Sequence, residues 1–186
     1  MISRMDWKRV LIGKWSWKRP FQSAVSIYLI LCFVAVFFAD RLIFVPPPAS
    51  YGVEFKGLIH LRSVAGEEIA AVHHPAAPGM PTFLYSHGNA EDLGHAADLY
   101  RIWNEMGFGV MAFDYPGYGV FTGTPDEASC NRSIESAWDY LRERGVSPES
   151  IVIVARSVGG GPGTWLASRE QVAGLVLIAP FTSAFR

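Results

Sequence analysis

The stretch that most limits the fold joins an apolar run directly to a serine and a cluster of glycines, in residues 151–167, IVIVARSVGGGPGTWLA. The apolar run predicts a strand, and the residues after Ser157 predict a helix that runs to about Arg169. Three interpretations of the turn between them are open. Either Ser157 is a catalytic nucleophile, or the glycines cradle a phosphate, or the glycines only allow the helix to pack closely on the sheet.

Motif spacing removes the phosphate-binding interpretation. A Walker loop requires a lysine followed by serine or threonine, and GGGPGT contains no lysine. The dinucleotide fingerprint requires glycines in the pattern GxGxxG, but Trp165 and Leu166 stand where the third glycine would approach. The packing interpretation stays open, since it needs only the glycines that follow the serine.

The nucleophile interpretation makes demands that the neighbouring residues meet. A serine hydroxyl needs a base to take its proton and donors to hold the oxyanion that forms. A sharp turn from strand to helix exposes the hydroxyl, and small residues two before and two after the serine allow that turn. Ala155 and Gly159 occupy these places, so ARSVG is a GxSxG elbow with alanine in place of the first glycine.

A second motif, FLYSHGNAEDLG, follows another predicted strand. It places His87, Gly88 and Asn89 directly after residues 82–86. A backbone N–H of Gly88 or Asn89, together with that of Val158, would complete an oxyanion hole. We expect His87 to brace loops through hydrogen bonds rather than to act as a base.

The pattern from Phe55 onward predicts an α/β fold. Short apolar runs alternate with helical stretches, which is typical of a mostly parallel sheet with flanking helices. The turn AGEE, residues 65–68, predicts a hairpin, so the sheet begins antiparallel. Helix periodicity covers residues 91–106 and 126–143. The predicted strands are residues 58–62, 69–73, 82–86, 110–113, 151–154 and 174–178.

An apolar segment precedes this domain. Residues 21–39 contain no charge and are long enough to cross a bilayer. Residues 1–20 are basic, which places the N-terminus in the cytoplasm and the rest of the chain outside. A cleaved signal peptide is the rival interpretation, but the run is long and no small-x-small cleavage pattern follows it. A proline-rich linker, residues 40–54, separates the anchor from the domain, residues 55–186.

Composition excludes some classes of partner. Half of the 186 residues are hydrophobic and the formal net charge is −1, so there is no basic balance for binding nucleic acid. Two cysteines are too few for a disulfide framework or a zinc site. We therefore expect no nucleic-acid partner and no metal.

Four motifs in order resemble successive signatures of the α/β-hydrolase superfamily: SHGNAEDLG, DYPGYGVFTGTPDE, ARSVGGGPGTWLASR and LIAPFTS. They are most similar to the membrane-associated branch that includes serine aminopeptidase-type hydrolases and the α/β-hydrolase-domain depalmitoylases. The resemblance implies an α/β-hydrolase fold without a cofactor, because a catalytic triad supplies its own base. It also implies a small-molecule, lipid, acylated or peptide substrate. The site residues that it implies are the nucleophile Ser157, oxyanion donors at Val158 and at Asn89 or Gly88, and Asp114 in a structural loop.

The chain departs from the family's order of serine, then acid, then histidine. No Asp or His follows Ser157. We expect the earlier His73 and His74 to face solvent and His95 to lie on a helix surface. We interpret residues 55–186 as the N-terminal two-thirds of a hydrolase domain, from a truncated gene or a fragment, and expect the chain as given to turn over little substrate.

The leading hypothesis is a single-pass membrane protein with a cytoplasmic N-terminus and a serine hydrolase domain on the outer face of the bilayer. It acts on an ester, thioester or amide through Ser157. One alternative is a non-catalytic, membrane-tethered remnant that binds or scaffolds. Another is a docking module whose exposed edge strand, residues 174–178, pairs with another chain.

Overall fold

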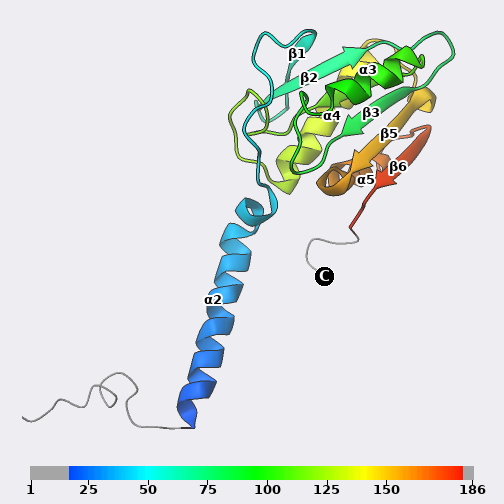
Figure 1. Ribbon diagram of the computed structural model, residues 1–186. Helices are drawn as coiled ribbons and strands as arrows, with labels where there is room; N and C mark the ends of the chain where they lie inside the picture. The colour runs from blue at the N-terminus through cyan, green and yellow to red at the C-terminus, as the bar shows by residue number, and fades with distance from the viewer. Residues whose placement is uncertain (1–16, 182–186) are drawn as a thin grey trace, which may run out of the picture. The chain divides into compact units, whose positions relative to one another are not determined.

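The computed structural model describes residues 17–181 and divides the chain into two compact units, Met1–Leu42 and Ile43–Arg186 (Figure 1). The predicted basic N-terminus, residues 1–20, lies largely outside the described residues. The described residues contain one helix long and apolar enough to cross a membrane, α2 (Lys18–Ile43), whose most apolar window has a mean hydropathy of 2.2. A signal sequence near the N-terminus has the same properties. The helix extends beyond the predicted segment 21–39 at both ends.

The second unit is built on a six-stranded sheet in the order β1-β2-β4-β3-β5-β6. β1 pairs with β2, and β2 with β4, in antiparallel fashion, whereas β4, β3, β5 and β6 are parallel. This confirms the predicted hairpin and the mostly parallel sheet. The elements are β1 (Leu58–Arg62), β2 (Glu68–His74), β3 (Thr82–Ser86), α3 (Ala97–Glu105), β4 (Gly109–Phe113), α4 (Glu127–Glu143), η1 (Pro148–Ser150), β5 (Ile151–Arg156), η2 (Ser157–Gly159), α5 (Gly160–Ala167) and β6 (Gly174–Ile178).

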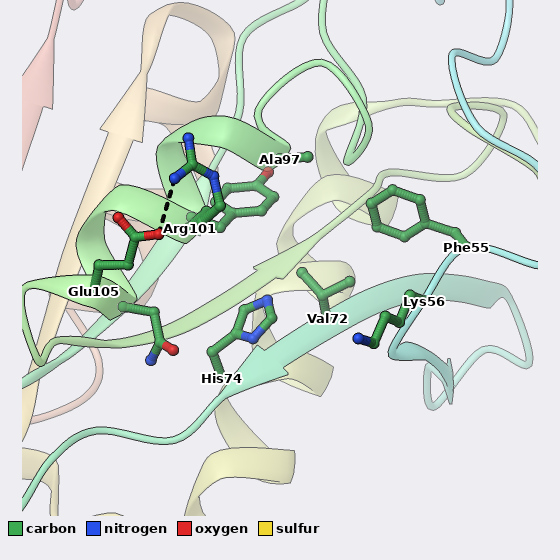
Figure 2. A pocket seen from close by; sticks show the side chains of 9 residues that line it. Phe55, Lys56, Val72, His74, Ala97, Arg101 and Glu105 are labelled. Carbon is green, nitrogen blue, oxygen red and sulfur yellow. Dashed lines mark hydrogen bonds and ion pairs between the residues drawn. The ribbon is translucent and has the colours of Figure 1, made fainter.

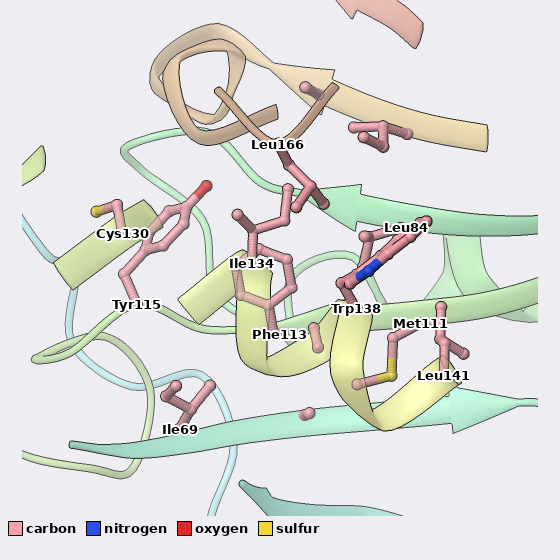
Figure 3. Close-up of a cluster of buried hydrophobic side chains, with 14 of the residues drawn as sticks. Ile69, Leu84, Met111, Phe113, Tyr115, Cys130, Ile134, Trp138, Leu141 and Leu166 are labelled. Atoms are coloured by element: carbon pink, nitrogen blue, oxygen red, sulfur yellow. The ribbon is translucent and has the colours of Figure 1, made fainter. Parts of the chain in front are cut away.

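Helices cover both faces of the sheet, which gives the unit two apolar layers. On β4, Met111 faces the side covered by α4 and α5, and Val110 faces the side covered by α3. This alternation follows from the two-residue period of a strand. Figure 3 shows the first layer, in which Leu84 and Met111 from the strands lie against Trp138 and Leu141 of α4. Central β4 is buried along its whole length, as expected for a parallel strand covered on both faces.

The helix predicted over residues 91–106 begins only at Ala97. The residues before it form turns, and buried carboxylates accept hydrogen bonds from two of their backbone N–H groups. Leu93 N–H donates to Asp114 and His95 N–H donates to Asp92. His95 therefore lies in a turn before α3 rather than on the helix surface that we expected. In contrast, α4 begins as predicted, with Asp126 and Ser129 forming a capping box.

The compact unit begins at Ile43, which is earlier than the domain boundary expected at residue 55. Phe44 is only 9% exposed and belongs to the core layer under α4. The prolines that suggested a linker are therefore flanked by residues that fold with the domain.

Candidate active site

Ser157 occupies a sharp turn between strand and helix. It directly follows β5, and its φ of 50° lies in the left-handed region that non-glycine residues rarely adopt. The 3-10 turn η2 and helix α5 continue from it without a break. Such backbone strain persists only where the surrounding structure imposes it, and it is common at functional sites.

The small residues of the elbow have distinct reasons to be small. A Cβ added to Gly159 would lie 2.6 Å from the carbonyl oxygen of His87, and closer still to that of Ser86, so only glycine fits there. Ala155 is buried on β5, opposite Gly163 of α5. A Cβ on Gly163 would lie 2.7 Å from the Ala155 methyl group. The elbow therefore tolerates alanine at its first position because the facing helix residue has no side chain.

The turn after β3 lies beside the serine. β3 and β5 are parallel neighbours, and Ser86 pairs with Ala155, so both turns leave the same edge of the sheet. A Cβ on Gly88 would lie 3.7 Å from the Ser157 Cβ. The structure thus brings Gly88 and Asn89 to the elbow that carries Ser157 and Val158.

A glutamate that the sequence did not single out joins these two turns. The Glu91 carboxylate accepts hydrogen bonds from the Gly88 N–H, at 3.2 Å, and from the Tyr85 hydroxyl, at 3.1 Å. It also pairs with Arg156, the residue before the serine. Each charge stands in one of the two motifs, but the two are far apart in the chain, so only the fold reveals the pair.

His87 and Asp114 lie in the interior behind the site. His87 is fully buried against the rings of Tyr115 and Tyr118, and its Nδ1 lies 2.8 Å from the Gly88 carbonyl oxygen. Its Nε2 lies 3.3 Å from Asp114 Oδ1, without the alignment of a hydrogen bond. Asp114 also accepts hydrogen bonds from Leu93 N–H and the Tyr51 hydroxyl. Both side chains are engaged in holding loops together.

Comparison with known proteins gives the family. The sequence model described as "Serine aminopeptidase, S33" matches residues 80–184, which is more than half of the chain. The chain belongs to this α/β-hydrolase family. It is 37% identical over 128 residues to the Homo sapiens alpha/beta hydrolase domain-containing protein 17B, covering 67% of this chain and 44% of that protein. It is 41% identical over 107 residues to the Mus musculus protein 17C, covering 56% of this chain and 33% of that protein.

Solved structures agree with the fold. An α/β-hydrolase from Vibrio vulnificus superposes with a TM-score of 0.59 at 25% identity, over 68% of this chain and 46% of that chain. The hydrolase GrgF from Penicillium gives a TM-score of 0.58 at 20% identity, over 66% and 45% of the two chains, and this similarity shows the fold alone. The chain spans less than half the length of these relatives.

Three other histidines of this α/β-hydrolase chain lie outside the elbow itself. His73 and His74 end β2, whose antiparallel pairing with β4 puts them at the edge of the sheet opposite Ser157. His73 was expected to face solvent, but it is half-buried with its ring edge-on to Tyr140, and burial lowers its pKa. The His95 Nδ1 lies at hydrogen-bond distance, 2.7 Å, from Asp92 Oδ1.

A separate pocket lies between β2 and α3 (Figure 2). Its volume is about 290 Å³, and its lining includes Phe55, Lys56 and His74. His74 places it toward the edge of the sheet opposite the elbow. The dashed line in Figure 2 joins Arg101 to Glu105, at 2.8 Å, so two of the charges that line the pocket are already paired with each other. Within residues 17–181, no three His, Cys, Asp or Glu side chains are grouped to hold a metal ion.

Proposed function

We propose that this chain carries the nucleophile of a membrane-anchored serine hydrolase that acts on an ester, thioester or amide by acyl transfer through Ser157. The observation that carries the proposal is the backbone of Ser157, held at a φ of 50° beside the turn of Gly88. A tight turn with a non-glycine residue in this region is costly, and a nucleophile elbow gives a reason for it.

In the proposed reaction, the Ser157 Oγ bonds to the substrate carbonyl carbon while a base takes the hydroxyl proton. The carbonyl oxygen becomes an oxyanion, and the backbone N–H groups of Val158 and Asn89 are the proposed donors to it. Asn89 is favoured over Gly88 because the Gly88 N–H already donates to Glu91. The bond to the alcohol, thiol or amine then breaks, the leaving group departs with the proton, and water releases the acyl group as an acid.

The proposal requires a base that these 186 residues do not offer after Ser157. The family's order places the acid and the histidine after the serine, and here neither an Asp nor a His follows it. His87 is buried and bonded to its own loop. We therefore propose that the base and acid come from residues outside this sequence.

Fluorophosphonate labelling tests the proposed nucleophile. We expect the full-length protein in its membrane to react with the probe, and the folded Ser157→Ala variant not to react. The 186 residues alone should react at least about 100-fold more slowly, because the oxyanion hole without a base retains only a small part of the rate. A folded, full-length protein that does not label would support the non-catalytic remnant instead.

We propose further that α2 anchors the hydrolase domain outside the membrane. The support is its apolar length and the basic residues before it. Protease treatment of intact cells should digest the domain, and an immunoblot should show an uncleaved chain. A soluble product shortened by about forty residues would identify a signal peptide instead.

A further inference from the structure

We propose that residues 43–51, here called the strap, position the Gly88–Asn89 turn so that its backbone can stabilise the oxyanion. The strap is the segment through which α2 leads into the domain. The inference rests on the proposed function of Ser157. It assigns a positioning role to the strap and to the side chains that form hydrogen bonds with it: Asn89, Asp92 and Asp114.

The Asn89 side chain forms the first set of hydrogen bonds to the strap. Its Nδ2 donates to the carbonyl oxygen of Ile43 at 2.6 Å, and its Oδ1 accepts from the Val45 N–H at 3.0 Å. Oδ1 also accepts from the Tyr118 hydroxyl at 2.5 Å. Both ends of the amide are therefore fixed, which leaves little freedom to the backbone N–H of the same residue. That N–H is the proposed oxyanion donor.

Two buried carboxylates accept the second set of hydrogen bonds from the strap. Asp92 is fully buried and accepts hydrogen bonds from both the N–H and the hydroxyl of Ser50. Asp114 is 1% exposed, and it accepts from the Tyr51 hydroxyl at 2.5 Å. Buried carboxylates need donors, because burial without them is costly. The strap supplies donors to both, so displacing it would leave two charges short of partners.

Glycines make room for the strap. A Cβ on Gly94 would lie 3.2 Å from the Tyr51 Cβ and would overlap the Ser50 hydroxyl. A Cβ on Gly119 would lie 2.9 Å from the Tyr51 ring and would overlap the Asp114 carboxylate. Two loops therefore lack side chains where residues 50 and 51 pass. This close approach distinguishes the strap from a linker that merely crosses the surface.

The strap can affect the site because its hydrogen bonds end on residues close to Ser157. Asn89 and Asp92 belong to the turn that follows β3, and the neighbouring Gly88 lies beside Ser157. The hydrogen bonds span 42 to 63 residues of sequence, from Ser50–Asp92 to Tyr51–Asp114. A donor must stand about 3 Å from the oxyanion and within about 0.5 Å of its productive position, so these hydrogen bonds act on catalysis by fixing that position.

The test uses the full-length protein in its membrane and the variant Asn89→Ala, which keeps the backbone N–H and loses the side-chain bonds to the strap. We expect kcat for a nitrophenyl ester to fall by about 10- to 100-fold with KM changed less than about threefold. Val53→Ala is the matched control, because Val53 lies just beyond the strap and is 71% exposed. Its kcat should stay within about twofold of wild type.

A second variant removes the strap's partner of Asn89 instead of Asn89 itself. Val45→Pro removes the N–H that donates to Asn89 and leaves the turn after β3 untouched. It should lower kcat in the same way, and the double variant should lose less than the product of the two single losses. If Asn89→Ala does not fold, Val45→Pro alone decides the question.

The outcomes separate this inference from the proposed function. If wild type is active, Ser157→Ala is inactive, and folded Asn89→Ala or Val45→Pro keeps the kcat of Val53→Ala, the strap is only structural and the inference is wrong. An increase confined to KM would also contradict it. If wild type does not hydrolyse the ester or label with the probe, the proposed function itself fails.

Discussion

The two sides of the elbow are held in different ways. On the side of the turn after β3, His87 and Asp92 are fully buried and Asp114 is 1% exposed. The His87 carbonyl oxygen and the carboxylates of Asp92 and Asp114 all accept hydrogen bonds from distant segments. On the side of β6, Val176 and Ile178 are 47% and 41% exposed, and the strand is held chiefly by its parallel pairing with β5. The comparison teaches that one side of the site is fixed by buried polar groups, while the other depends on the backbone ladder.

The largest effect should come from removing Asp114. Asp114→Ala leaves the Leu93 N–H and the Tyr51 hydroxyl without their acceptor. We expect the free energy of unfolding to fall by about 2–5 kcal/mol, since each buried, unsatisfied donor costs about 1–3 kcal/mol. Urea denaturation followed by tryptophan fluorescence in detergent measures it. Val176→Thr, on the β6 side, should change it by no more than about 0.5 kcal/mol. If Asp114→Ala and Val176→Thr lowered the free energy of unfolding equally, the two sides of the elbow would not differ in how they are held.

Two glycines give the next contrast. A methyl group on Gly159 would meet the backbone of β3 and its turn, and Gly159→Ala should cost about 1–3 kcal/mol or more. Gly161 in α5 has nothing within 4 Å of an added methyl group. Gly161→Ala should therefore raise stability by up to about 1 kcal/mol, because alanine favours helix. Thermal unfolding monitored by circular dichroism gives both values. A tolerated Gly159→Ala would mean that the elbow is less tightly packed than described.

Lowering the pH should remove the contribution that Asp92, in the turn after β3, makes to the free energy of unfolding. Burial by itself would raise the pKa of Asp92, but hydrogen bonds from Ser50 and His95 outweigh it and lower the pKa. A carboxyl group with a lowered pKa stabilises the fold above its unfolded value of about 3.9, and this contribution is lost as the pH falls through the folded pKa. Asp92→Asn should therefore be less stable than wild type at pH 7 and should lose less stability below about pH 4.

Asp139 provides a control, because its pKa is shifted in the opposite direction. Burial, helped by Glu143 and Glu170, raises the pKa of Asp139 on α4. Ionised Asp139 thus destabilises the fold at neutral pH, so Asp139→Asn should be more stable than wild type at pH 7, and the difference should vanish in acid. Denaturation midpoints at pH 7 and at about pH 3 distinguish the two variants. Parallel pH profiles for Asp92→Asn and wild type would contradict the assignment.

The smallest change in stability, but a clear change in association, should come from a charge on β6. Val176→Lys places a cation on an exposed edge strand, where charges hinder pairing with another chain. We expect less self-association of the 186-residue chain in sedimentation velocity, with stability altered by no more than about 0.5 kcal/mol. Unchanged association would show that β6 is not the surface through which copies meet.

Local patterns predicted most of the sheet and the elbow. The bounds of β1, β3 and β6 match the predicted residues, and the glycine spacing around Ser157 predicted the turn that the structure contains. The helix over residues 91–106 was predicted too long, because helical periodicity cannot show that the Leu93 N–H is bound to Asp114 on another part of the fold. The Glu91–Arg156 pair was missed because its two residues are far apart in the chain.

The sequence by itself determined the fold family, the strand order along the chain and the serine at the end of β5, since each depends on residues close together in the chain. Only the tertiary structure decided that residues 43–51 fold onto the domain and that Asn89, Asp92 and Asp114 hold them. The physical reason is distance along the chain. The strap residues that donate to Asn89, Asp92 and Asp114 lie 42 or more residues away from them, and periodicity in the sequence does not reveal partners so distant.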